Sequence, residues 1–117
     1  MRPDINARDR GYLDDIFEWG EEIRSLLRHK KLTDYVKEPA TRAATERWIE
    51  LIGEASKSLS QSFRDSFPDI PWDDVIGMRD FLAHQYARVD HPVVWNTAKK
   101  DIPDLLKALK RSYPTRK

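Results

Sequence analysis

Residues 44–59, ATERWIELIGEASKSL, decide the fold class. Their apolar side chains recur every three or four positions, at Ala44, Trp48, Leu51, Ile52, Ala55 and Leu59. This spacing places them along one face of an α-helix. Gly53 lies inside the stretch, and glycine lowers helix stability by roughly 1 kcal/mol relative to alanine. We therefore expect a tight helix crossing at Gly53.

The same spacing extends along most of the chain. We expect helices over about residues 8–29, 39–62, 71–88 and 93–111, with a connector at 30–38 that has room for one helical turn. Pro68 and Pro71 separate the second helix from the third, and Pro103 predicts a kink or break in the last. No segment alternates strictly between apolar and polar residues. The prediction is an all-α single domain over residues 1–117, a bundle of four to five helices with its core at about 8–111 and a short basic C-terminal tail.

The composition excludes several classes of function. The 117 residues contain no cysteine and three histidines, His29, His84 and His91. Disulfides, thiol catalysis and cysteine zinc sites are therefore excluded, and no two histidines have a metal-ligand spacing on one helix face. No apolar run approaches the about 18 residues of a membrane span, and the charged N-terminus is unlike a secretory signal. We expect a cytoplasmic protein with no membrane, metal or cofactor of its own.

Charge is unevenly distributed although the formal net charge is +1. Residues 99–117 are mainly basic, whereas residues 12–22 and 65–74 are mainly acidic. Such runs are typical of solvated helix surfaces, and a basic end that binds nucleic acid or an acidic partner is the alternative.

The third expected helix contains the residues that could take part in catalysis. A helical wheel predicts a core face of Val75, Met78, Phe81, Leu82 and Val89. It places Arg79, Asp80, Ala83 and His84 on the opposite, polar face, with Tyr86 beside Arg79 at the edge of the core.

Each polar residue suits one task. Arg79 can bind a phosphate with two N–H groups, His84 can exchange a proton near neutral pH, and Asp80 can orient the imidazole four residues on. These roles describe a metal-independent phosphodiesterase that acts on RNA, with the ribose 2′-OH as nucleophile. One histidine cannot easily be both base and acid. The second group could come from another copy facing it across a dimer axis, with the small Ala83 permitting close approach, or from a non-histidine acid such as Tyr86. The alternative is an exposed ion-pair cluster without catalytic meaning.

Several short motifs resemble one known family in matching order. Arg79, His84 and Tyr86 form an R-x4-H-x-Y motif. Around it lie Ile52-Gly53-Glu54-Ala55, Pro68-x-Ile70-Pro71-Trp72, Gly77-Met78-Arg79-Asp80, Val94-Trp95 and Asp101-Ile102-Pro103. From about Asp14 to Leu109 the chain resembles the HepT-like toxins of the HEPN superfamily.

The resemblance implies a specific system. It implies an all-α homodimer with the two motif helices facing each other, and a metal-independent endoribonuclease toxin of a type VII toxin–antitoxin module in which Arg79 and His84 are catalytic. It also implies a partner, a minimal nucleotidyltransferase antitoxin of the MntA type, which uses ATP to transfer AMP to Tyr86 and silences the toxin. Relatives often have Asn where this chain has Asp80, whose charge lowers the local positive potential.

Two other functions remain open at this point. The chain could be a non-catalytic helical subunit that docks a nucleotidyltransferase and presents nucleotide or substrate to it. A purely structural helical dimer is the third possibility.

Overall fold

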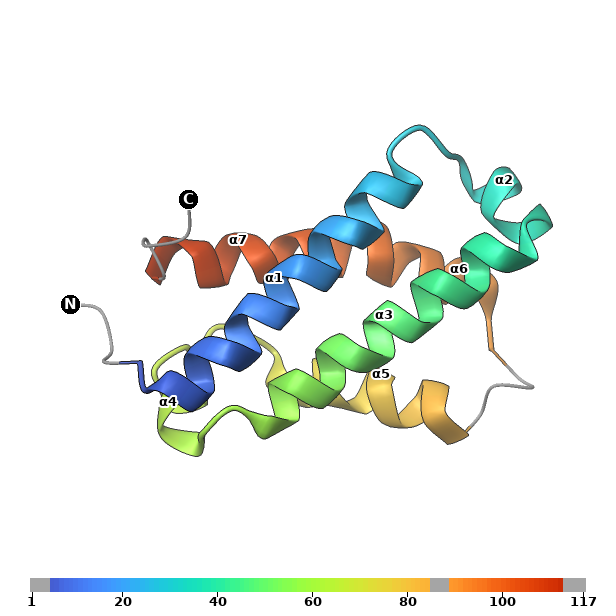
Figure 1. The fold of residues 1–117 in the computed structure, drawn as a ribbon. Coiled ribbons are helices and arrows are strands. Elements are labelled where there is room, and N and C mark those ends of the chain that lie inside the picture. The colour runs from blue at the N-terminus through green and yellow to red at the C-terminus, as the bar shows by residue number, and fades with distance from the viewer. Residues whose placement is uncertain (1–4, 85–88, 113–117) are drawn as a thin grey trace.

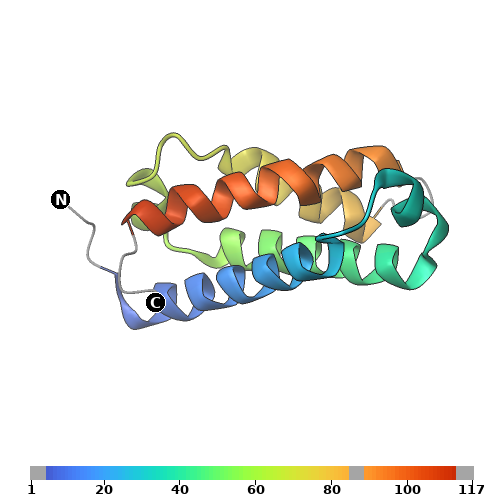
Figure 2. The same ribbon diagram turned by 90° about the horizontal axis from the view of Figure 1, so that it is seen from above.

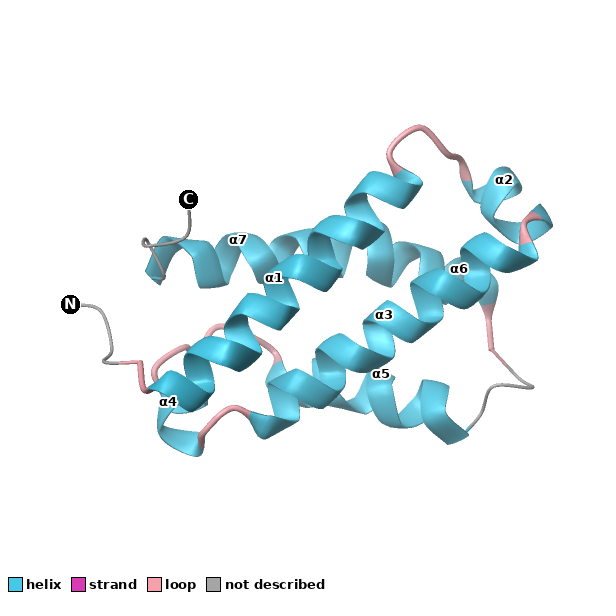
Figure 3. Cartoon of the chain, in the orientation of Figure 1, coloured by secondary structure: helices cyan, strands magenta, loops and turns pink. Residues whose placement is uncertain are grey.

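The computed structural model describes residues 5–84 and 89–112, except for the side chains of residues 83–84 and 111–112. Within these ranges the chain consists of helices and loops without a strand, which confirms the all-α prediction (Figure 3). In chain order the helices are α1 (Ala7–Leu27), α2 (Leu32–Lys37), α3 (Pro39–Ser58), α4 (Gln61–Asp65), α5 (Trp72–His84), α6 (His91–Asn96) and α7 (Ile102–Ser112), with a π-helical segment, η2 (Thr97–Asp101), before α7. No helix in the described ranges is long and apolar enough to cross a membrane.

The four long segments form two layers (Figures 1 and 2). Helices α1 and α3 pack side by side in one layer, and α5 and the α6–η2–α7 segment lie against them in the other. Between the layers lies a single apolar core, whose completely buried members include Leu13, Ile16, Ile52, Val94 and Leu109. Burying one such side chain stabilises the fold by about 1.5–3 kcal/mol, so the core holds the two layers together.

The second helix ends earlier than the sequence predicts. The backbone of Leu59 is extended, and Ser60 then caps the separate helix α4 by accepting a hydrogen bond from Phe63 N–H. Asp9, which is 3% exposed, fixes this corner. Its two carboxylate oxygens accept hydrogen bonds from Ser60 N–H at 2.8 Å and from Ser60 Oγ at 2.6 Å. The start of α1 is thereby tied to the start of α4, 51 residues away.

The predicted irregularity near Pro103 is present, in the form of η2. Proline has no N–H to donate and its ring displaces the carbonyl one turn earlier. The chain accommodates it with a widened turn, in which Ile102 N–H donates to Thr97 C=O, five residues back. The helix therefore continues into α7 instead of ending.

Candidate functional site

Helix α5 carries the predicted site, and the loop before it fixes where the helix begins. Trp72 Nε1 donates hydrogen bonds to the carbonyls of Arg64 and Phe67, each at 3.2 Å. The carbonyl of Pro71 accepts from the N–H groups of the first helical turn. The start of α5 is therefore anchored to the end of α4 and to the loop that follows it.

Gly53 of α3 determines how closely α5 approaches. A Cβ atom at Gly53 would lie 2.3 Å from Arg79 Cβ and 3.1 Å from the carbonyl oxygen of Val75. The first distance is far below a normal van der Waals contact, so no larger residue fits without moving α5. This confirms the tight crossing expected from the sequence, and it places the stem of Arg79 directly over α3.

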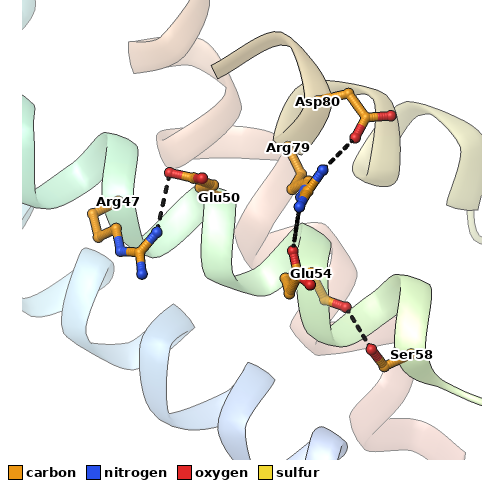
Figure 4. Close-up of polar contacts among 6 residues, drawn as sticks. All are labelled: Arg47, Glu50, Glu54, Ser58, Arg79 and Asp80. Atoms are coloured by element: carbon orange, nitrogen blue, oxygen red, sulfur yellow. Dashed lines mark hydrogen bonds and ion pairs between the residues drawn. The ribbon is translucent and has the colours of Figure 1, made fainter. Parts of the chain in front are cut away.

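The guanidinium of Arg79 lies between two carboxylates, one from each helix (Figure 4). Its Nη2 lies 2.7 Å from Glu54 Oε1, and its Nε donates to the same oxygen at 2.8 Å. Its Nη1 donates to Asp80 Oδ1 at 2.8 Å. These hydrogen bonds, first to Asp80 and then to Glu54, raise the pKa of Arg79 above its ordinary value. The cation is thus permanently charged and held in one orientation.

The site remains reachable from solvent. The side chain of Arg79 is 23% exposed, and the side chains of Glu54 and Asp80 are more than half exposed. A guanidinium has five N–H donors, and the contacts above engage three of them. An incoming phosphate can therefore use the others or displace a carboxylate, and exposed ion pairs are worth only about 0–1 kcal/mol.

The helical wheel is wrong in one respect. It places Arg79 opposite the core and Phe81 within it, whereas Arg79 faces α3 and Phe81 is 38% exposed. Leu82, at 6% exposure, is buried as predicted. The wheel gives angles between side chains correctly, but α5 packs mainly on α3, so its contact face is rotated away from Phe81 and toward Arg79.

The other predicted members are only partly described. Asp80 lies on α5 and contacts Arg79, as above. His84 is the last described residue of α5, and its side chain lies outside the described part of the chain. From helix geometry its Cα is about 7.5 Å along the axis from that of Arg79. Tyr86 also lies outside the described residues, so the roles assigned to His84 and Tyr86 stay predictions.

Glu54 is the residue that sequence reasoning missed as a site member. It appears in the IGEA motif, next to the crossing glycine, and that adjacency was the available signal. A residue next to the contact residue lies about 100° around the helix, at the flank of the interface. A long carboxylate side chain there can reach a charge on the partner helix.

The two remaining histidines lie outside α5. His29 follows α1 and is exposed. His91 begins α6, where the Asp90 side chain caps the helix by accepting a hydrogen bond from Val93 N–H at 3.2 Å. The imidazole of His91 meets the ring of Tyr35 edge-on at 6.4 Å. In the described residues no group of three or more His, Asp or Glu side chains could hold a metal ion.

Comparison with known proteins gives a consistent family. The model of a family described as "Ribonuclease HepT-like" matches residues 16–112. A "Probable ribonuclease HepT" from Thermococcus cleftensis is 42% identical over 96 residues, which are 82% of this chain and 87% of that protein. Two proteins named "Putative RNase" are also similar. The one from Caldanaerobacter subterraneus is 38% identical, covering 86% of this chain and 90% of that protein. The one from Methanocaldococcus jannaschii is 35% identical, covering 87% and 84%. No solved structure matches the chain with significance.

Proposed function

The chain belongs to the ribonuclease HepT-like family, which makes it an endoribonuclease, and we propose that it is the toxin of a type VII toxin–antitoxin module. The observation that carries the proposal is the Arg79 guanidinium. It is charged, held by Glu54 and Asp80, and accessible on the helix that also bears His84. Arginine in this position can bind an RNA phosphate and stabilise the charge that develops on it.

The proposed reaction needs no metal. The ribose 2′-OH loses its proton to a base and its oxygen attacks the adjacent phosphorus. The bond from phosphorus to the 5′-oxygen breaks, and that oxygen takes a proton from an acid. The products are a 2′,3′-cyclic phosphate and a free 5′-hydroxyl. His84 is the proposed proton carrier, and Arg79 stabilises the negative charge on the non-bridging phosphate oxygens.

Base and acid are best supplied by two copies of His84 in a homodimer. The outer face of α5 supports this arrangement. Phe81 is an exposed large apolar residue there, and a Cβ added to Gly77 would have no atom within 4 Å. A glycine and an exposed aromatic side chain on one helix face suit close contact with an identical helix.

We further propose regulation by a nucleotidyltransferase antitoxin of the MntA type, in the cytoplasm. The Tyr86 hydroxyl would attack the α-phosphate of ATP, form a phosphodiester with AMP and release pyrophosphate. An AMP group near Arg79 adds negative charge and bulk, which would compete with RNA for the guanidinium.

The test is RNA cleavage by the purified protein in EDTA. We expect cleavage by the wild type, loss of at least about a hundredfold in His84→Ala, and no change in His29→Ala, a matched control outside the site. Product ends should carry cyclic phosphate. Equal activity in the two histidine variants would remove His84 from the mechanism.

A non-catalytic docking subunit is the second candidate. It is favoured by the two carboxylates on Arg79, which lower the local positive potential. Mass measurement after mixing with the antitoxin and ATP separates the two. Gains in steps of AMP that disappear in Tyr86→Phe support the regulated toxin. No gain and no cleavage support the docking subunit.

A further inference from the structure

A groove separates α5 from the α6–η2–α7 segment, on the side of α5 away from Asp80. It has a volume of about 880 Å³ and an apolar lining that includes Ile49 of α3, Val75 and Met78 of α5, and Leu105 of α7. Val93, at the start of α6, also lines it and is 50% exposed. Removing apolar surface from water is favourable in free energy. A large apolar groove with an exposed valine therefore indicates a binding surface.

The rim of the groove is acidic. Five carboxylates line it, all on exposed residues: Asp69, Asp74, Asp90, Asp101 and Asp104. Among the described residues of the lining, the one cation is Lys100, whose Nζ pairs with Asp104 Oδ2 at 3.0 Å. The groove thus combines an apolar floor with a strongly negative edge, which repels an RNA backbone and attracts a cation.

We propose that this groove docks an amphipathic helix of a partner protein, with an apolar stripe flanked by Lys or Arg. Its walls are helices and the described residues offer no strand edge, so a helix laid into the groove is the packing mode available. The volume accommodates about two turns of a helix roughly 10 Å across. Met78 in the wall can adapt its shape to an incoming side chain. The partner's cations would meet the carboxylates at the rim.

The inference does not depend on RNA cleavage, because the groove contains none of Arg79, Asp80 or Glu54. It concerns a second surface of the same helix. Arg79 of α5 packs against α3, while Val75 and Met78 of the same helix line the groove.

The experiment uses the full chain and a fluorescent Leu/Lys peptide with helical spacing. A Leu/Glu peptide of the same pattern is the charge control. We expect the Leu/Lys peptide to bind, as measured by anisotropy, with affinity that falls as salt increases. The Leu/Glu peptide should bind at least about tenfold more weakly. Absence of Leu/Lys binding, or equal binding of both peptides, would overturn the proposal.

Two matched pairs of variants locate the site. Val93→Lys should weaken binding about tenfold, whereas Val36→Lys, at the other exposed valine, should change it less than about twofold. Asp74→Asn should weaken it about twofold to threefold, whereas Asp73→Asn, its neighbour outside the groove, should not. Equal effects within either pair would contradict the proposal.

Two further outcomes identify a different occupant. If Val93→Lys but not Val36→Lys converts the protein to a smaller species in sedimentation, a second copy fills the groove. If Val93→Lys changes the binding of a single-stranded RNA and Val36→Lys does not, the groove is a nucleic-acid surface. Either result overturns the partner-helix assignment, and neither is expected.

Discussion

Two helix crossings in this protein are built on glycine, and they differ in what the glycine meets. At Gly20 of α1, an added Cβ would lie 2.6 Å and 2.9 Å from the two terminal methyl groups of Leu106. At Gly53 of α3, it would meet the Cβ of Arg79 and a backbone carbonyl. A leucine tip can rotate, whereas a Cβ and a backbone cannot move without their helix. The first crossing is adaptable, and the second is fixed and carries the site.

The largest effect is expected for Gly53→Ala. Displacement of α5 should lower the free energy of unfolding by about 2 kcal/mol, even though alanine favours the helix by about 1 kcal/mol. Cleavage should fall at least about tenfold, because a shift near 1 Å misplaces Arg79. Urea denaturation and cleavage of a fluorescent RNA measure the two effects. Wild-type behaviour in both would show that the crossing tolerates a methyl group.

Glu54→Gln tests whether the fixed crossing positions the guanidinium. Loss of the charge should loosen Arg79 and lower kcat about fivefold, with little change in the free energy of unfolding because the carboxylate is exposed. Glu50→Gln is the control, since Glu50 lies one turn earlier on α3 and pairs with Arg47 instead (Figure 4). A similar loss of kcat in both variants would show that it comes from removing one negative charge on α3 and not from the contact between Glu54 and Arg79.

Asp80→Asn should act in the opposite direction. It removes a negative charge 2.8 Å from Arg79 Nη1 but keeps an oxygen that can accept its hydrogen bond. RNA affinity should rise about twofold to threefold, and log Kd should depend slightly more steeply on log salt. Titration at several salt concentrations measures both. Unchanged affinity would mean that Asp80 does not compete with phosphate.

The smallest effect is expected for Gly20→Ala. Rotation of Leu106 should accommodate the methyl group, and the gain in helix propensity of about 1 kcal/mol should offset the remaining strain. The midpoint of urea denaturation should therefore shift little and cleavage should not change. A loss as large as that of Gly53→Ala would remove the distinction between the two crossings.

The local sequence predicted the long helices from the apolar spacing, and the tight crossing at Gly53 from the cost of a glycine inside a helix. It did not predict that Arg79 faces α3 or that Phe81 is exposed. Those facts depend on which neighbour α5 packs against, and a wheel drawn for one helix contains no neighbour. Glu54 was missed for the same reason, because its ion pair with Arg79 forms only where α3 and α5 pack together.

The widened turn of η2 also bears on how the chain tolerates changes in length. Val94, Ala98, Ile102 and Leu106 are all buried and follow one another at intervals of four. In a regular α-helix such a series drifts around the axis by about 40° per step. A segment with bonds five residues long counteracts the drift, and π segments act as extra residues inserted into a helix. Deleting one residue between Thr97 and Asp101 would therefore restore a regular α-helix and leave the buried face of α7 turned toward the core, with α7 shifted by about 1.5 Å along its axis.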